Sequence, residues 1–137
     1  MIVVDASVAA KWFLPEAGSE EATQLLSGAD KLIAPDLVRV EVAAAITRRV
    51  RLGELPEEEA MQICNAWLKA LADGVVTLTP VEDDLTEAIK LAIELKHPLQ
   101  DCLYLAVAVR LKAALITSDP KFVERSSALY PSVRMLS

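Results

Sequence analysis

Short apolar runs alternate along the chain with longer segments in which apolar residues recur at helical spacing. The first run, Ile2–Val4, shows no polar alternation, which is typical of a strand that is covered on both faces. Three later runs have the same character and a fourth suits an edge strand: Lys31–Ala34, Val75–Leu78, Ala114–Thr117 and, at the edge, Val133–Leu136. The pattern therefore predicts four short strands and a fifth near the end of the chain.

Helices are predicted between these strands, and most of them begin or end beside a proline or a glycine. They cover Ala6–Leu14, Ser19–Ser27, Pro35–Arg51, Pro56–Ala72, Asp83–Leu95, Leu99–Lys112 and Pro120–Arg125. The middle of the Leu99–Lys112 segment is apolar on every side, so this helix is expected to be central and buried. Strands that alternate with helices imply right-handed crossovers and a mostly parallel sheet flanked by helices.

The chain has 137 residues, which suits a single domain over residues 1–137 that can bury a core without disulfides. Hydrophobic residues make up 53% of it but aromatic residues only 4%, so the core must consist mainly of Ala, Val, Leu and Ile. We find no internal repeat, low-complexity segment or interdomain linker. An α/β fold with a central sheet of four or five short strands is therefore expected.

The formal net charge of −6 is unusual for a protein that binds nucleic acid, because neutralising phosphates normally requires a basic surface. This net charge argues against a protein whose function is nonspecific binding to DNA. It is compatible with an enzyme whose acidic residues gather at a metal site while a few cations guide the backbone of the substrate. The cations available for this are Lys11, Arg39, Arg48, Arg49 and Arg51.

Two cysteines, Cys64 and Cys102, lie in apolar segments and lack the paired spacing of a zinc site or a disulfide framework. The first residues have no basic region followed by an apolar run, as a signal peptide would. No uncharged stretch approaches the length of a membrane span. We therefore expect a cytoplasmic protein with no membrane partner.

Four acidic residues occur where the chain leaves the carboxyl edge of the expected sheet, which is where ligands bind in open α/β folds. Asp5 ends the first strand and Asp119 ends the fourth. Glu41 lies about two turns into the helix after the second strand, and Asp101 lies in the first turn of the all-apolar helix. The topology of the fold would bring these four side chains to one place.

Each acid also has a purely structural reading. Asp5 could cap the helix that follows it, and Asp119, which precedes a proline, could do the same. Asp101 could be an acid favoured by the dipole of its helix. Glu41 shares a core-facing stripe with apolar residues, so its charge needs a cation or a partner such as Arg48.

The combination of the four is harder to explain by structure alone. Carboxylates within about 5 Å of one another repel by roughly 3 kcal/mol per pair at an effective dielectric constant near 20. A divalent cation would relieve this repulsion, and oxygen ligands suit Mg²⁺ or Mn²⁺, which serve phosphodiester hydrolysis. The hydroxyls of Ser7, Thr117 and Ser118 lie beside Asp5 and Asp119 in sequence, either as polar neighbours of the site or as local turn hydrogen bonds.

Two other α/β classes fit the sequence less well. A receiver-type phosphoacceptor domain would have adjacent acids after its first strand, whereas Asp5 stands alone, and Lys121 lies inside a helix start. A dinucleotide or nucleoside-triphosphate fold would need a glycine-rich fingerprint, which does not occur among the four glycines.

Four blocks of the sequence resemble the PIN-domain family, and within it the VapC-type toxins. They are Val4–Val8 continuing into Lys11–Pro15, Pro35–Val42, His97–Ala106 and Leu115–Asp119. The blocks occur in family order and with family-like spacing, and they span nearly the whole chain. The resemblance implies a PIN-like three-layer sandwich and a magnesium-dependent endoribonuclease, with manganese as a possible substitute. It also implies that RNA is the substrate, that the protein is a homodimer and that an antitoxin protein is its partner.

Roles follow from the resemblance by position. Asp5 and Asp101 would be the principal metal ligands, with Glu41 and Asp119 completing the acidic cluster directly or through water. Ser7 and Thr117 would be polar neighbours of the cluster. One departure is Gln100, which stands where these toxins often have an aromatic residue. That position is not a ligand, so the departure bears on the fit of the substrate.

Three alternatives remain open on the sequence. The PIN scaffold could serve as a binding module with little nuclease activity, or the nuclease could cut DNA, because nothing visible reads a 2′-hydroxyl. The apolar segment Trp12–Leu14 could pack in the core, or it could form with the helix Leu37–Ile46 a groove for an antitoxin helix. If this groove forms, the antitoxin would place a basic side chain among the acids.

Overall fold

Five short strands, all parallel, form the centre of the computed structural model, which describes residues 1–137. They are β1 (Ile2–Val4), β2 (Leu32–Pro35), β3 (Thr77–Thr79), β4 (Ala114–Thr117) and β5 (Val133–Met135). Their order across the sheet is β3-β2-β1-β4-β5. The chain therefore builds outward from β1 in one direction and then returns to add β4 on the other side of β1. The boundary between β1 and β4 is the switch point at which ligands of such sheets bind.

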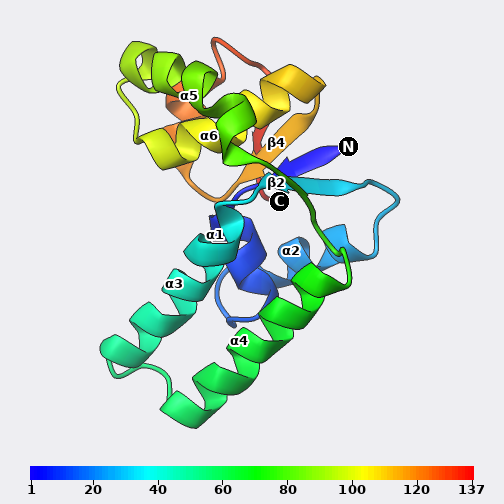
Figure 1. Cartoon of the computed structure of the whole chain (residues 1–137), viewed down its shortest axis with the longest axis vertical. Helices are drawn as coiled ribbons and strands as arrows, with labels where there is room; N and C mark the ends of the chain where they lie inside the picture. The colour runs from blue at the N-terminus through cyan, green and yellow to red at the C-terminus, as the bar shows by residue number, and fades with distance from the viewer.

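Helices cover both faces of the sheet, as the absence of polar alternation in β1 predicts. Val3, Ile33 and Leu115 pair across the sheet and pack into the larger core with α6 (Leu99–Leu111). Val4 belongs to a smaller core with α1 (Ala6–Ala9) and α2 (Ser19–Leu26) on the opposite face. The three layers confirm the expected sandwich (Figure 1).

Residues 102–108 of α6 are all buried, which confirms the prediction that this helix is central. It packs against α5 (Val81–Leu95), and the two lie together on one side of the sheet (Figure 1). A short helix, α7 (Pro120–Ser126), connects β4 with β5. None of the helices combines the length and the apolar character that crossing a membrane requires.

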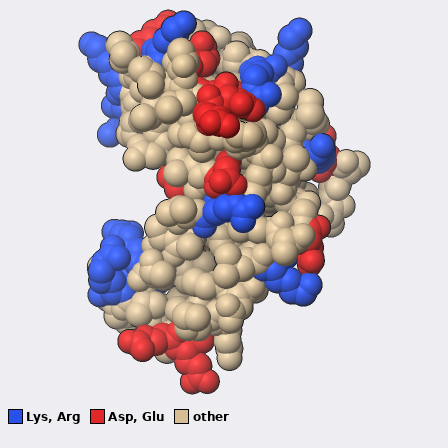
Figure 2. Space-filling view, viewed as in Figure 1, with Lys and Arg blue, Asp and Glu red and all other residues tan.

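On the other side of the sheet, α3 (Val38–Arg51) and α4 (Glu57–Ala72) form a long hairpin that extends away from the sheet (Figure 1). Lys and Arg side chains gather on the α3 side of this hairpin, and Asp and Glu side chains gather at its tip (Figure 2). The buried Trp67 of α4 anchors the hairpin, because its ring packs edge-on against Phe13 and its indole N–H donates to the Arg39 carbonyl.

Several boundaries differ from those expected. The helix expected at Pro35 begins at Val38, because Pro35 lies in β2 opposite Thr79 and the Asp36 N–H donates to the Thr79 carbonyl. The strand expected over Val75–Leu78 is Thr77–Thr79, since this pairing with β2 sets its register. The first helix ends at Ala9 and continues as a 3-10 turn, η1 (Ala10–Trp12), and α5 begins two residues earlier than expected.

Candidate active site

The carboxyl ends of β1 and β4 meet at the switch point of the sheet, and candidate residues follow both strands. Asp5 comes directly after β1 and is the N-cap of α1, accepting a hydrogen bond from the Val8 N–H. Thr117 is the last residue of β4, and Asp119 is the N-cap of α7. Neighbouring parallel strands thus bring residues more than one hundred positions apart to a single edge.

Asp5 is the most buried acid of the site, with 5% of its surface exposed. Burial raises the pKa of its carboxyl from 3.8 to about 6, and the nearby charge of Asp101 also raises it. Hydrogen bonds from the Ser7 and Thr117 hydroxyls and the Val8 N–H act in the opposite direction, but they offset only part of the pKa shift. Asp5 is therefore a helix cap whose burial disfavours its charged form.

The Ser7 hydroxyl links the two strand ends. It donates to Oδ1 of Asp5 at 2.6 Å and accepts from the Ser118 N–H at 3.1 Å. The Thr117 hydroxyl accepts from the Asp119 N–H at 3.1 Å and also bonds to Asp5. Both hydroxyls thus make the local bonds expected of turn residues and orient Asp5 as well. The buried Ser118 hydroxyl, by contrast, has no hydrogen-bond partner.

Glu41 reaches the same region from α3, where it lies in the first turn of the helix. Our expectation of a position two turns into the helix was wrong, because the preceding strand runs to Pro35 and the helix begins at Val38 instead of Pro35. Its partner is not Arg48 but Tyr104 of α6, whose phenol donates to Oε1 at 2.6 Å. Burial raises the pKa of Glu41 and the Asp101 charge adds to this rise, while the Tyr104 hydrogen bond lowers it.

Asp101 is the acid that connects the others. It lies in the first turn of α6, and its charge raises the pKa of both Asp5 and Glu41. On its other side, ligand atoms of His97, Asp101 and Asp119 all lie within 4.8 Å of one another. Asp101 is thus linked to Asp119 by distance and to Asp5 and Glu41 by the effect of its charge, whereas the group of ligand atoms within 4.8 Å includes neither Asp5 nor Glu41.

Asp119 fits both readings that its position allowed. Its Oδ1 accepts from the Lys121 N–H at 3.0 Å, as in an N-cap, and its carboxylate also lies near Asp101. A single carboxylate has two oxygens, so capping does not prevent it from serving the cluster. The sequence order of a strand, an acid and a proline predicted the cap, and the fold added the second neighbour.

Two residues of the site were not among the sequence candidates. His97 hydrogen-bonds to Oδ2 of Asp101 at 2.7 Å, and Tyr104 bonds to Glu41. Tyr104 lies three residues after Asp101 on α6, so the two share a helix face, and His97 lies four residues before Asp101 in the turn that precedes the helix. This spacing, together with the polar group of Tyr104 in an otherwise apolar stretch, was the signal that could have identified them.

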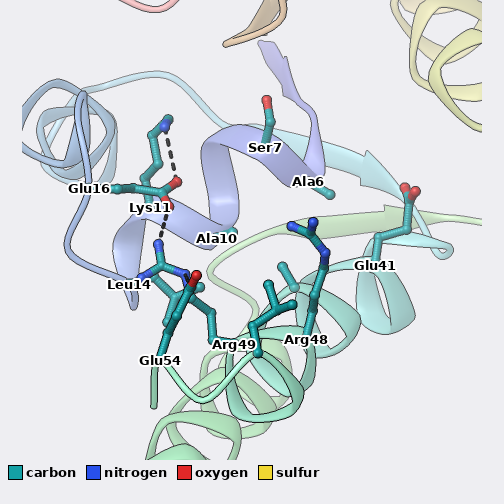
Figure 3. Close-up of a pocket in the computed structure, with 12 residues that line it drawn as sticks. Ala6, Ser7, Ala10, Lys11, Leu14, Glu16, Glu41, Arg48, Arg49 and Glu54 are labelled. Carbon is teal, nitrogen blue, oxygen red and sulfur yellow. Dashed lines mark hydrogen bonds and ion pairs between the residues drawn. The ribbon is translucent and has the colours of Figure 1, made fainter.

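A pocket of about 300 Å³ adjoins the cluster between η1 and α3, and Ser7 and Glu41 line one end of it. Three cations also line it (Figure 3). Lys11 and Arg49 both bond to the Glu16 carboxylate, at 3.0 and 2.6 Å, whereas Arg48 makes no ion pair. The Arg48 side chain rises from α3 toward the start of α1, on the same side as Glu41 and Ser7 (Figure 3).

The segment Trp12–Leu14 packs mainly into the protein. Leu14 is buried, the ring of Phe13 contacts Trp67, and the Trp12 indole N–H donates to the Ala22 carbonyl at 2.8 Å. Of the two alternatives left open for this segment, core packing describes Trp12 and Phe13, which are partly buried and pack against the hydrophobic clusters that include residues of α2 and α4. Leu14 does reach the pocket, together with residues of α3.

The chemistry of the cluster fits a divalent cation. All four carboxylates supply the hard oxygen ligands that Mg²⁺ and Mn²⁺ prefer. The pKa values of Asp5 and Glu41 are raised mainly by burial and to a smaller extent by the charge of Asp101, so a cation bound beside them would favour their ionised forms. Perturbed carboxyls in a cleft are typical of a functional site.

The open parallel sheet and the carboxylates at its switch point define an α/β protein with an acidic site at the carboxyl edge. The sequence model of the PIN domain matches residues 2–127, and the chain belongs to the PIN-domain family. Among its relatives is Ribonuclease VapC3 of Pyrobaculum aerophilum, which is 33% identical over 129 residues, or 93% of this chain and 96% of the relative.

Solved structures resemble the fold over its whole length. The VapC20 toxin of Mycobacterium tuberculosis, described as cleaving the sarcin-ricin loop, has a TM-score of 0.71 at 20% identity and aligns over 98% of this chain and 99% of its own. A chain of a toxin–antitoxin complex from Klebsiella pneumoniae has a TM-score of 0.66 at 16% identity, over 100% and 97%. These identities are low, so the two structures establish the fold alone.

Proposed function

We propose that this protein is a divalent-metal-dependent endoribonuclease and the toxin of a toxin–antitoxin pair. The observation that carries the proposal is the position of Asp101, whose charge acts on Asp5 and Glu41 while its carboxylate neighbours Asp119. Carboxylates that lie near one another repel, and a protein with a purely structural role would gain nothing from this repulsion. The identity to a ribonuclease over nearly the whole chain supports RNA as the substrate.

In this proposal Asp5 and Asp101 are the principal ligands of Mg²⁺, or of Mn²⁺ in its place, and Glu41 and Asp119 complete the site directly or through water. When bound, the cation would supply the positive charge that phosphodiester hydrolysis requires. Hydrogen bonds from Ser7 and Thr117 orient the Asp5 carboxylate at the end of β1. A hydrogen bond from Tyr104 orients the Glu41 carboxylate on α3.

The pocket beside the cluster offers a path for the RNA strand. Arg48 is exposed and has no acidic partner, so its guanidinium is free to bind a phosphate next to the bond that is cut. Lys11 and Arg49 share Glu16, and an approaching phosphate can compete for them. These three cations would attract the anionic RNA locally, although the protein as a whole is acidic.

Cleavage of RNA by the wild type and Asp5→Asn, each with Mg²⁺ and with EDTA, tests the proposal. We expect cleavage only by the wild type with Mg²⁺, while the circular dichroism spectra of the two proteins coincide. Cleavage by Asp5→Asn that persists in EDTA would refute the metal site. A folded wild type that binds RNA without cutting it would favour the alternative, a PIN scaffold used as a binding module. A parallel assay on DNA decides whether the activity is restricted to RNA.

A toxin needs an antitoxin, and the pocket beside the acids is the surface on which we expect it to bind. The resemblance to a chain of a toxin–antitoxin complex is consistent with such a partner. An antitoxin cation placed among the acids would replace the charge of the metal. Its affinity for Asp101→Asn and Glu41→Gln should then be lower and less dependent on salt than its affinity for the wild type. Equal affinity and salt dependence would show that no cation enters the site.

Two further properties come from the family resemblance. We propose a homodimer, which light scattering after size-exclusion chromatography would test. We also propose that the protein works in the cytoplasm, which is consistent with free thiols at Cys64 and Cys102.

A further inference from the structure

His97 is the only histidine of the chain, and it is buried beside Asp101. Its ring stacks on Phe122 of α7, with the ring centres 4.6 Å apart and the planes 9° from parallel. Its Nε2 lies 2.7 Å from Oδ2 of Asp101. Only 3% of the His97 side chain is exposed, compared with 34% of the Asp101 side chain. The His97 ring is thus buried and held by stacking, whereas the carboxylate that it contacts is partly exposed to solvent.

The second ring nitrogen shows which way the hydrogen bonds run. Nδ1 of His97 lies 3.2 Å from a terminal guanidinium nitrogen of Arg125. An arginine side chain has donors only, so Nδ1 must accept this hydrogen bond. In the neutral ring the hydrogen is then on Nε2, which donates to Asp101. The chain of hydrogen bonds runs from Arg125 through His97 to Asp101.

This assignment bears on how the cluster can bind a metal. Ligand atoms of His97, Asp101 and Asp119 lie within 4.8 Å of one another, an arrangement that alone suggests a histidine ligand. A metal ion needs a nitrogen lone pair, but the Nε2 lone pair is replaced by a hydrogen and the Nδ1 lone pair is used by Arg125. His97 can reach a metal only by breaking one of the two bonds.

We propose that Arg125 and His97 are positioning residues, which orient the Asp101 carboxylate toward the bound cation, and that His97 is not itself a metal ligand. The inference rests on the proposed function, because it takes Asp101 as a ligand. Partners of this kind fix the orientation of a ligating carboxylate, and their loss typically weakens metal binding 10- to 100-fold.

Helix α7 connects this arrangement to the rest of the site. Asp119 caps its first turn, Phe122 supports the His97 ring, and Arg125 lies one turn further on. Arg125 also donates to the Lys96 carbonyl at 3.0 Å, just before His97, so α7 is tied to the turn between α5 and α6. One short helix therefore sets the relative positions of Asp101 and Asp119.

Two substitutions at His97 separate its hydrogen bond from its packing. His97→Phe keeps an aromatic ring on Phe122 but removes the N–H donor. His97→Gln keeps an N–H donor of similar reach but loses the stacked ring. We expect the dissociation constant for Mn²⁺, measured by the electron spin resonance signal of the free ion, to rise about tenfold in His97→Phe and less than about threefold in His97→Gln. The melting temperature should fall more in His97→Gln than in His97→Phe, because only His97→Gln loses the stacked ring. The two variants are therefore ordered oppositely in stability and in Mn²⁺ affinity.

Arg125 is tested by the same measurement. Arg125→Met should weaken Mn²⁺ binding, and Arg125→Lys, which retains a charged donor, should restore part of the affinity. The matched control is Arg134→Met, because Arg134 is exposed on β5 and makes no ion pair. It removes the same charge and should leave the affinity unchanged. Equal losses for Arg125→Met and Arg134→Met would mean that only net charge matters and would overturn the role of Arg125.

Nitrogen NMR of histidine-labelled wild type gives an independent readout, since the single histidine needs no further assignment. We expect Nε2 protonated and Nδ1 unprotonated, both before and after Mg²⁺ is added. A ring nitrogen that loses its proton and shifts on binding Mg²⁺ would show that His97 is a ligand and would overturn the inference. Unchanged Mn²⁺ affinity in His97→Phe would do the same, whereas a wild type that binds no Mn²⁺ would instead refute the proposed function.

Discussion

The phenol of Tyr104 donates a 2.6 Å hydrogen bond to Oε1 of Glu41, which joins the central helix α6 to the first turn of α3. Tyr104 is almost fully buried, so the carboxylate is held from inside the protein while its other oxygen remains available. The bond lowers the pKa of Glu41 against the effects of burial and of Asp101. The hydrogen bond therefore favours the ionised form of Glu41, which is the form that binds a metal.

Tyr104→Phe should weaken Mn²⁺ binding, and more so at pH 6 than at pH 8, because the pKa of Glu41 rises further when the hydrogen bond is lost. The free energy of unfolding should fall by about 1 kcal/mol. Tyr130→Phe is the matched control, since its phenol bonds to the Ala113 carbonyl at 2.7 Å, outside the acid cluster. It should lose similar stability and keep its Mn²⁺ affinity. Identical metal binding by the two variants would contradict the role of Tyr104.

The raised pKa of Asp5 predicts an unusual dependence of stability on pH in EDTA. The folded protein holds the Asp5 proton up to about pH 6, whereas the carboxyl has its ordinary pKa of 3.8 in the unfolded chain. Protonation thus favours the folded state, and this contribution is lost as the pH rises from about 4 to about 6. The loss is about 3 kcal/mol for a difference of roughly two pKa units.

Urea unfolding of the wild type and Asp5→Asn across this pH range measures the effect. The free energy of unfolding of the wild type should decline relative to that of the variant between pH 4 and pH 6, and the difference should be constant above pH 7. A wild type that gains stability relative to the variant over this interval would mean that the pKa of Asp5 is lowered by folding. Above pH 6, Mg²⁺ should recover much of the stability that is lost between pH 4 and pH 6, because it binds the ionised carboxyl.

Asp101→Asn should raise thermal stability in EDTA, since it removes repulsion with Asp5 and Glu41 and retains an oxygen that accepts from His97. We expect a gain of about 1 kcal/mol, or several degrees in melting temperature. Mg²⁺ should then stabilise the wild type more than the variant. If Asp101 only complements the helix dipole, its loss should cost about 0.3–1 kcal/mol. Glu57→Gln, in the first turn of α4, measures that dipole effect outside the cluster.

Two substitutions at Asp119 distinguish its cap from its role in the cluster. Asparagine caps helices as well as aspartate does, so Asp119→Asn should change the free energy of unfolding by less than about 0.5 kcal/mol and still weaken Mn²⁺ binding. Asp119→Ala should weaken Mn²⁺ binding equally and cost a further ~1 kcal/mol of stability. If Asp119→Asn binds Mn²⁺ as tightly as the wild type does, Asp119 acts only as a helix cap and does not bind the metal.

Arg48→Ala should raise the KM for RNA about tenfold with little change in kcat, because an unpaired cation beside the site contributes to binding the phosphate backbone. The slope of log affinity against log salt should fall by about one unit. Arg51→Ala, one turn further along α3 and also without an ion pair, is the matched control. If Arg51→Ala raises KM as much, the effect belongs to the charge of the helix rather than to the pocket.

The sequence alone determined the elements that carry the site. Apolar runs without alternation identified β1 and β4, and the acids that follow them were candidates because residues after parallel strands meet at one edge. The central position of α6 followed from its apolar residues on every side. These features are local, so they can be read along the chain without knowing what each segment packs against.

Tertiary structure alone decided the partners of the acids. Glu41 could have paired with Arg48 on its own helix, but the packing of α6 against the sheet brings Tyr104 to it and leaves Arg48 in the pocket. The start of α3 also changed, because pairing with β3 extends β2 to Pro35. Likewise, only the docking of α7 brings Arg125 to His97 and so assigns its ring nitrogens. Hydrogen bonds between distant segments depend on distances that the three-dimensional packing sets, and spacing along one helix or strand carries no information about them.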